Sequence, residues 1–299
     1  MKKSVSLLLA GLMLCGALAG CGGNNNTAEN TDSQTEQTSE STGTSGAIHV
    51  VSREDGSGTR GAFVELTGVE DDNGDNTTVD AEIANRTDAV LTTVAGNEAA
   101  IGYVSLGSLN DTVKAVTVDG VEATVDNVKS GTYTLSRPFN IATKGEPTGV
   151  AEDFINFILS ADGQAIVEEE NYIKVDDAAP AFTSDGSSGQ IAVGGSSSVS
   201  PVMEKLIEAY KAVNPNAQID LQTSDSTSGM TGAMDGTFAI GMASRELKDE
   251  EAAQLTGTAI ALDGIAVIVN TANTVENLTM DQIRSIYVGE TTDWSEVAE

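Results

Sequence analysis

Residues 53–60 read Arg-Glu-Asp-Gly-Ser-Gly-Thr-Arg, and residues 194–201 read Gly-Gly-Ser-Ser-Ser-Val-Ser-Pro. Each stretch follows a short β-branched run and precedes a segment with helical periodicity, which predicts a strand, a turn of small residues and the start of a helix. Backbone N–H groups at a helix start lack intrahelical partners and lie at the positive end of the helix dipole. Two such turns facing each other would bind an oxyanion between them.

The charge of the chain narrows the kinds of partner it can have. It carries 45 acidic residues against 15 Lys and Arg, a net charge of -30. A chain this acidic has no basic surface with which to collect nucleic acid, so nucleic acid is not an expected partner. Because the overall field repels anions, an anion site must depend on local, desolvated N–H and O–H dipoles, to which an arginine could add.

The N-terminus predicts export and anchoring. Two lysines (residues 2–3), a largely apolar run (residues 5–18) and Leu18-Ala19-Gly20-Cys21 have the order of a secretory signal, and the end resembles a bacterial lipoprotein signal. We therefore expect residues 1–20 to be a signal peptide and Cys21 to carry a lipid anchor, on the outer face of the bacterial cytoplasmic membrane. An ordinary signal peptide with an incidental cysteine is the alternative.

The stretch after Cys21 predicts a tether. Residues 22–46 contain no aromatic residue, no Ile, Leu or Val and no Lys or Arg. Such a composition cannot bury a core, so we expect residues 21–46 to be a disordered tether.

The remaining body predicts an α/β fold. β-like and helical stretches alternate along it, which is typical of parallel or mixed sheets covered by helices. Ligands of such sheets lie at the carboxyl ends of the strands, where the serine- and glycine-rich turns fall. The expected strands are 48–52, 99–105, 139–143, 190–193, 218–222, 238–243 and 258–270, and the expected helices are 61–66, 151–159, 164–170, 201–213 and 279–287.

Several blocks of this body together carry a family resemblance: 52–60, 100–105, 136–139, 195–199, 240–247, 263–270 and 278–289. Taken together, they resemble the phosphate-binding components of phosphate-specific ABC importers. The resemblance implies a two-lobed, class II periplasmic-binding-protein-like fold with two crossover strands. It also implies capture of inorganic phosphate between the lobes, delivery to ABC permease subunits in the membrane, a monomer, and no enzyme activity or cofactor.

The order of the blocks differs from the order that this family usually has. The half that normally comes second precedes the half that normally comes first, so the chain is predicted to be circularly permuted, with residues 183–189 linking the ancestral ends. On this mapping residues 47–110 and 271–299 form one lobe and residues 111–270 form the other. Close, exposed termini tolerate such a rearrangement.

The resemblance assigns phosphate-binding roles to two serine turns. Ser197 and Ser198 match positions that offer N–H and hydroxyl donors before a helix, and Ser226 matches a second hydroxyl donor. As isolated turns these residues would be no more than turns.

A third block is expected to come from the other lobe. Arg53, Ser57, Gly58 and Thr59 match its phosphate-binding positions, with Arg53 making a two-pronged charged contact. Asp55 is the expected partner that orients Arg53.

The resemblance also raises a question of selectivity. An aspartate that accepts the proton of phosphate is expected directly before Ile240, where this chain has Ala239. Asp225 could replace that acceptor, or it could be a solvated turn residue. A receptor for another tetrahedral oxyanion such as sulfate or arsenate, or a phosphate sensor without a transport role, therefore stays an alternative.

A phosphate-ester hydrolase is the rival class. It would have to use the single histidine, His49, but the chain lacks both a Gly-x-Ser-x-Gly nucleophile elbow and the Gly-Lys-Ser/Thr ending of a P-loop. Without a cluster of cysteines or histidines, zinc is not expected either. The acidic loop at residues 70–75 is a weak calcium candidate and is better explained as a solvated insertion, so no metal site is expected.

Overall fold

The computed structural model describes residues 44–297. The predicted signal peptide, Cys21 and all of the predicted tether except residues 44–46 lie outside the described residues. Within the described part, no helix has both the length and the apolar character needed to cross a bilayer.

Strands and helices alternate over most of the described chain, as expected for an α/β fold. In chain order they are β1 (His49–Arg53), α1 (Gly58–Thr67), β2 (Glu70–Asp71), β3 (Gly74–Asp75), β4 (Glu82–Ala84), α2 (Thr87–Ala95), β5 (Ala100–Ser105), η1 (Leu106–Ser108), β6 (Val113–Ala115), β7 (Thr117–Val118), α3 (Val125–Lys129), β8 (Ser136–Thr143), α4 (Val150–Ile158), α5 (Ala161–Glu169), β9 (Gly189–Ser196), α6 (Ser200–Val213), β10 (Ala217–Ser224), α7 (Ser226–Asp235), β11 (Ile240–Ala243), α8 (Asp249–Ala252), β12 (Thr256–Asn270), β13 (Asn277–Leu278), α9 (Met280–Tyr287) and η2 (Trp294–Glu296).

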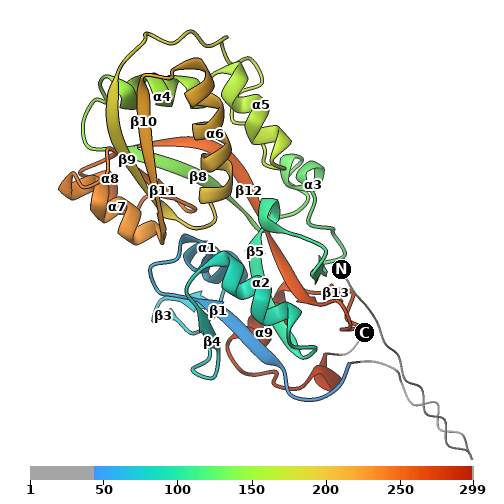
Figure 1. The fold of residues 1–299 in the computed structure, drawn as a ribbon. Coiled ribbons are helices and arrows are strands. Elements are labelled where there is room, and N and C mark those ends of the chain that lie inside the picture. The colour runs from blue at the N-terminus through green and yellow to red at the C-terminus, as the bar shows by residue number, and fades with distance from the viewer. Residues whose placement is uncertain (1–43, 298–299) are drawn as a thin grey trace, which may run out of the picture. The chain divides into compact units, whose positions relative to one another are not determined.

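One long strand, β12, joins the two halves of the sheet (Figure 1). The strand order is β10-β9-β11-β8-β12-β5-β1-β4, with β6 also paired to β12. The first part of β12 pairs antiparallel with β8, and from Ile265 onward it pairs antiparallel with β5. On either side of this junction the neighbouring strands β9, β10 and β11, and likewise β1, β4 and β5, run parallel to one another. The chain thus has the mixed α/β architecture that the sequence predicts.

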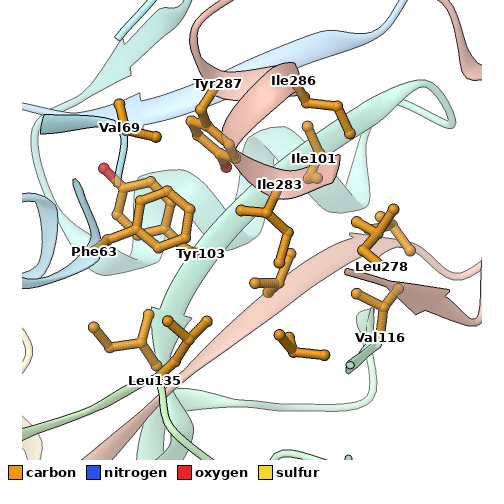
Figure 2. Close-up of a cluster of buried hydrophobic side chains, with 14 of the residues drawn as sticks. Phe63, Val69, Ile101, Tyr103, Val116, Leu135, Leu278, Ile283, Ile286 and Tyr287 are labelled. Carbon is orange, nitrogen blue, oxygen red and sulfur yellow. The ribbon is translucent and has the colours of Figure 1, made fainter. Parts of the chain in front are cut away.

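The first core brings together segments that are far apart in the sequence (Figure 2). Phe63 of α1 stacks on Tyr103 of β5 with ring centroids 3.9 Å apart, and Tyr287 of α9 packs edge-on against Phe63 at 4.7 Å. Ile283 and Ile286 of α9 are buried in the same cluster. Helix α9, from the C-terminal part of the chain, therefore completes a core that begins with β1 and α1.

The second core is formed around β8, β9 and β11. Helices α4 and α6 cover it, with Phe154 and Phe157 packing against Tyr210 at 5.0 and 5.6 Å between ring centroids. Residues 116–135 contribute to the first core rather than to this one. The residues of the two cores therefore favour a chain that passes from one half to the other near residues 135–139 and 261–265. The sequence mapping predicts these crossings near residues 110 and 270 instead.

A buried ion pair lies where β8 and β12 pass between the cores. The Arg137 guanidinium donates to the Asp263 carboxylate at 3.0 and 3.1 Å, and the Ser105 hydroxyl donates to the same carboxylate at 2.9 Å. Burial raises the pKa of Asp263 to about 6, against the opposing effect of Arg137. The pair connects three strands at the junction of the two halves.

The two ends of the described chain lie side by side, as the sequence analysis predicts for the ends of a permuted chain. The Trp294 N–H donates to the Gly46 carbonyl at 3.0 Å, and the Ile48 N–H donates to the Thr292 carbonyl at 2.8 Å. The Thr44 hydroxyl is 3.0 Å from that of Thr274. Residues 44–46, predicted to belong to the tether, are thus attached to the folded body.

Candidate anion-binding site

A cluster of buried hydroxyls lies where four helices begin. It consists of Arg53 and seven hydroxyl side chains, all less than 9% exposed, which we call the hydroxyl cluster: Thr59, Thr87, Ser196, Ser197, Ser198, Ser226 and Ser244. Buried hydroxyls need hydrogen-bond partners, and here they find them mainly in one another. The cluster therefore concentrates donors in a place that water does not reach freely.

Each of the four helices contributes a hydroxyl at or just before its first turn. Thr59 is the second residue of α1, Thr87 and Ser226 are the first residues of α2 and α7, and Ser198 lies two residues before α6. Pro201 occupies the first turn of α6, where its missing N–H costs no hydrogen bond. The positive ends of four helix dipoles therefore converge on the cluster, which favours an anion there.

Hydrogen bonds join hydroxyls from the two halves of the chain. The Thr59 hydroxyl is 2.9 Å from that of Ser198. On the other side of the cluster the Ser244 N–H donates to the Ser226 hydroxyl at 3.1 Å, and the Ser196 hydroxyl donates to that of Ser244 at 2.9 Å. The three predicted turns, around residues 57–59, 197–198 and 226, are thus brought together.

Arg53 supplies the charge within the cluster. Its Nη2 atom donates to the Ser197 hydroxyl at 3.1 Å, and its side chain is only 3% exposed. Tyr103 holds the backbone at this position, because the Arg53 backbone N–H donates to the Tyr103 hydroxyl at 3.2 Å. Burial raises the pKa of Tyr103 to about 12, so this phenol stays neutral at physiological pH.

The predicted partner of Arg53 is wrong. Glu54, not Asp55, holds the guanidinium, with Nε and Nη2 each donating to a carboxylate oxygen at 2.8 Å. The Asp55 side chain is 97% exposed and accepts from Arg60 at 2.8 Å instead. Glu54 can reach Arg53 because it lies one residue beyond the end of β1, where the alternation of a strand no longer holds neighbouring side chains on opposite faces.

Ser57 and Gly58 hold the start of α1 against α7. The Ser57 hydroxyl caps the helix by accepting from the Arg60 N–H at 3.3 Å. Gly58 leaves room for the opposing helix, because a Cβ atom there would overlap the Ser226 hydroxyl and lie 2.8 Å from that of Ser244. The Gly56 carbonyl accepts from the Thr227 N–H at 3.1 Å. This close approach requires small residues in the turn.

Asp225 has a structural role. Its carboxylate caps α7 by accepting from the Ser228 N–H at 2.8 Å and from the Ser228 hydroxyl at 2.5 Å. A carboxylate with both oxygens engaged in this way is a helix cap, the turn-residue alternative of the sequence analysis. Its part in recognising a ligand proton stays untested.

Position 239, where the sequence analysis expects an acceptor for the phosphate proton, lies away from the hydroxyl cluster. Ala239 is exposed and directly precedes β11, whereas the hydroxyl cluster lies beyond the carboxyl end of that strand, at Ser244. Because ligands bind at the carboxyl ends of the strands, the side chain at position 239 is at the wrong end to meet one. The cluster residue that β11 positions is Ser244, which directly follows the strand.

Three cluster residues were missed in the sequence. Ser196 and Ser244 lie within recognised blocks, so their place at strand ends was an available signal. Thr87 offered none, because α2 begins without a side-chain cap and is rich in threonine and valine, which are poor helix formers. Only the fold brings Thr87 to the other hydroxyls.

The single histidine and a second buried arginine are each paired with a carboxylate. The His49 ring is 2.8 Å from the Glu82 carboxylate and about a third exposed. Arg245, a second buried arginine, is bound by Glu251 at 2.7 and 2.8 Å. Over residues 44–297, no group of three or more His, Cys, Asp or Glu side chains could hold a metal ion.

Comparisons with known proteins agree on one family. A family model described as the PBP superfamily domain matches residues 17–162 and 180–299. The chain is 48% identical over 305 residues to "Phosphate-binding protein PstS 2" of Streptococcus agalactiae and 44% identical over 300 residues to the protein of the same name from Streptococcus pneumoniae, with 99% of each chain covered in both cases.

A solved structure is similar as well. The crystal structure of a phosphate ABC transporter, phosphate-binding protein from Streptococcus pneumoniae TIGR4 has a TM-score of 0.69 and 46% sequence identity, and covers 85% of this chain and 100% of that one. The two streptococcal relatives match this chain nearly from end to end.

Proposed function

The chain belongs to the PBP superfamily and, within it, to the phosphate-binding proteins of phosphate ABC transporters, and on that premise we propose that the hydroxyl cluster is where it binds inorganic phosphate. It is an extracytoplasmic solute-binding protein that captures phosphate and delivers it to an ABC permease. As a member of this family it is a binding protein rather than an enzyme.

One observation carries the assignment of the site. A single guanidinium and seven buried hydroxyls, from strand ends and from the starts of four helices, converge at the junction of two hydrophobic cores. Phosphate needs many hydrogen-bond donors and partial neutralisation, which this arrangement supplies without a basic surface. Arg53, Ser57, Gly58, Thr59, Ser197, Ser198 and Ser226 are the proposed phosphate-binding residues, and an anion enclosed among them would hold the two halves together.

The site also bears on selectivity among anions. Glu54 is the carboxylate that contacts Arg53, and the remaining cluster groups are hydroxyls, which can both donate and accept. Hydroxyls accept the proton of phosphate less strongly than a carboxylate does, so discrimination against sulfate is expected to be modest.

Calorimetric titration of the purified protein with phosphate, and then with sulfate, tests the proposal. We expect saturable, one-to-one phosphate binding with weaker sulfate binding and no hydrolysis of an aryl phosphate. The proposal would be overturned if titration with millimolar phosphate produced no heat of binding. Turnover of the aryl phosphate would favour the hydrolase instead.

We further propose that Cys21 carries a lipid anchor and that the protein acts as a monomer at the membrane. The support is the order of basic, apolar and small residues before Cys21. Cys21→Ser should abolish incorporation of labelled fatty acid into the protein. Incorporation that persists after this change would contradict anchoring at Cys21.

A further inference from the structure

We propose that Thr87, at the start of α2, is a direct ligand of the bound anion and a fourth arm of the site. The inference rests on the proposed phosphate function. It adds a residue from a segment that lies outside every turn assigned to phosphate so far.

The contacts of Thr87 are with the residues proposed to hold phosphate. Its hydroxyl lies 3.2 Å from that of Ser198 and 3.3 Å from that of Ser197, and Arg53 Nη1 donates to it at 3.4 Å. The residue is 94% buried, being 6% exposed. These are long contacts for hydroxyl pairs, whose usual spacing is about 2.7–2.8 Å. The Thr87 hydroxyl therefore has more to gain from an anion oxygen than its protein partners now provide.

The distances between Thr87 and the proposed phosphate-binding residues indicate that its hydroxyl contacts the ligand. An oxyanion that accepts from Arg53, Ser197 and Ser198 must lie among their donor atoms, and Thr87 is within 3.4 Å of all three. Hydrogen bonds to a charged group are stronger than those between neutral hydroxyls, so the Thr87 O–H would turn to the anion.

The start of α2 is open to such a contact. The residue before Thr87, Arg86, makes no side-chain cap for the helix, and its guanidinium is bound outward to Asp88 at 3.1 Å. The side-chain capping that Ser57 provides for α1 is thus absent at α2. The N-cap residue of α2 therefore provides no side-chain acceptor, and the one acid of the first turn, Asp88, is exposed and paired with Arg86.

A groove leads from solvent to this point. Its volume is about 390 Å³, and its walls include Thr87 and Leu91 on the α2 side and Ser197, Ser200 and Glu204 on the α6 side. Thr87 and Ser197 belong to both the groove and the hydroxyl cluster. These two residues therefore lie between the groove and the buried donors, so Thr87 would be among the groups that contact an entering or leaving anion.

The test uses three variants of the purified full-length protein, with Thr87→Ala as a fourth should Thr87→Val lose stability. Thr87→Val removes the hydroxyl and keeps the shape, Thr87→Ser keeps the hydroxyl, and Thr92→Val is the matched control. Thr92 is exposed on the same helix and donates to the Asp88 carbonyl at 2.8 Å, away from the cluster. Phosphate affinity is measured by calorimetry, dissociation rate by stopped-flow fluorescence, and folding by thermal melting.

We expect Thr87→Val to weaken phosphate binding about tenfold or more, mainly through faster dissociation. Thr87→Ser should stay within about threefold of the unmodified protein, and Thr92→Val should not change binding. Thr87→Val with unchanged affinity, or Thr87→Ser as weak as Thr87→Val, would refute the role of the hydroxyl. If Thr87→Val melts at a clearly lower temperature, the comparison of Thr87→Ser with Thr87→Ala decides instead. An unmodified protein that fails to bind phosphate would contradict the proposed function, a separate outcome.

Discussion

Arg53 Nη2 lies 3.1 Å from the Ser197 hydroxyl, although 144 positions separate the two residues in the chain. The contact joins the turn after β1 to the turn after β9, the two stretches that most clearly predict anion binding. Both turns follow parallel strands, so the carboxyl ends of two separate strand sets face each other across the junction of the two cores.

Removing the Arg53 charge should abolish tight phosphate binding. Arg53→Ala leaves a buried dianion without a cation, which costs roughly 2–5 kcal/mol of binding free energy by analogy with broken charge pairs. Calorimetry should show this loss, while Arg86→Ala, which removes a half-exposed arginine paired with Asp88, should have little effect. Equal affinities for Arg53→Ala and the unmodified protein would show that phosphate binds elsewhere.

A methyl group at position 58 should keep the two halves apart. The Cβ of Gly58→Ala would collide with the Ser226 and Ser244 hydroxyls, and overpacking of this kind costs roughly 1–3 kcal/mol. Since the collision exists only when the halves meet, phosphate affinity should fall. The melting temperature of the ligand-free protein should change little.

Gly61→Ala on the same helix is the control, because its nearest new contact is Arg245 Cδ at 3.8 Å, an ordinary distance. Small-angle X-ray scattering with and without phosphate would report closure. Normal closure and affinity in Gly58→Ala would mean that the described contact between α1 and α7 is not part of the phosphate-bound state.

Much of the fold could be predicted from periodicity and turn residues. The expected strands and helices correspond to β1, β5, β8–β12, α1, α4–α6 and α9, and the capping box that starts α9 is present. These elements are long or strongly patterned, with β-branched runs or an apolar helical face. Their local sequences agree with the tertiary structure.

Two helices that form the site could not be predicted, because packing rather than propensity stabilises them. Helix α7 contains Gly229 and Gly232, both unfavourable in a helix. A Cβ at Gly229 would lie 2.7 Å from Gly195 Cα and one at Gly232 would overlap Phe238, so the glycines permit close packing on the sheet. Helix α2, which brings Thr87, is similar in lacking a local signal. The partner of Arg53 was missed because sequence cannot distinguish which of two adjacent acids faces inward.

Asp225→Ala should affect stability more than selectivity. Loss of the α7 cap costs about 1 kcal/mol, visible as a lower melting temperature. If Asp225 is only a cap, the variant should change phosphate and sulfate affinities by the same factor. A selective loss of phosphate binding with sulfate unchanged would instead support Asp225 as the acceptor of the phosphate proton.

Asp153 should link stability to pH. The buried carboxylate accepts from the Ser184 and Tyr210 hydroxyls at 2.7 Å and from the Asp185 N–H at 3.0 Å. Burial acts to raise the pKa of Asp153, but these hydrogen bonds together hold it below its usual value of 3.8. The charged form is therefore favoured in the folded state, and its stabilising effect is present above about pH 4 and lost as the pH falls below that value.

Asp153→Asn should lower the free energy of unfolding at pH 7 by roughly 1–3 kcal/mol, because it places an amide donor among donors. The difference from the unmodified protein should shrink toward pH 3 in urea titrations. Glu152→Gln, at the neighbouring exposed position of α4, is the control and should show no such trend. A constant difference across this pH range would exclude ionisation of Asp153 as the cause.

The order of segments predicts that the chain can be reconnected. Trp294 and Gly46 are hydrogen-bonded at 3.0 Å, so a short glycine–serine connection can join the ends near them. Reopening between Gly186 and Ser187 keeps the contacts of Ser184 and Asp185 with Asp153 on one new end, and that of the Ser187 carbonyl with Asn214 on the other. Each doubling of a loop's length costs only about 0.6 kcal/mol, so stability should change little.

The rearranged chain should fold and bind phosphate with an affinity within about threefold of that of the original. A chain reopened after Leu206, buried in α6, should fail to fold. A Gly186-opened chain that folds but binds no phosphate would show that the site depends on the present order of segments.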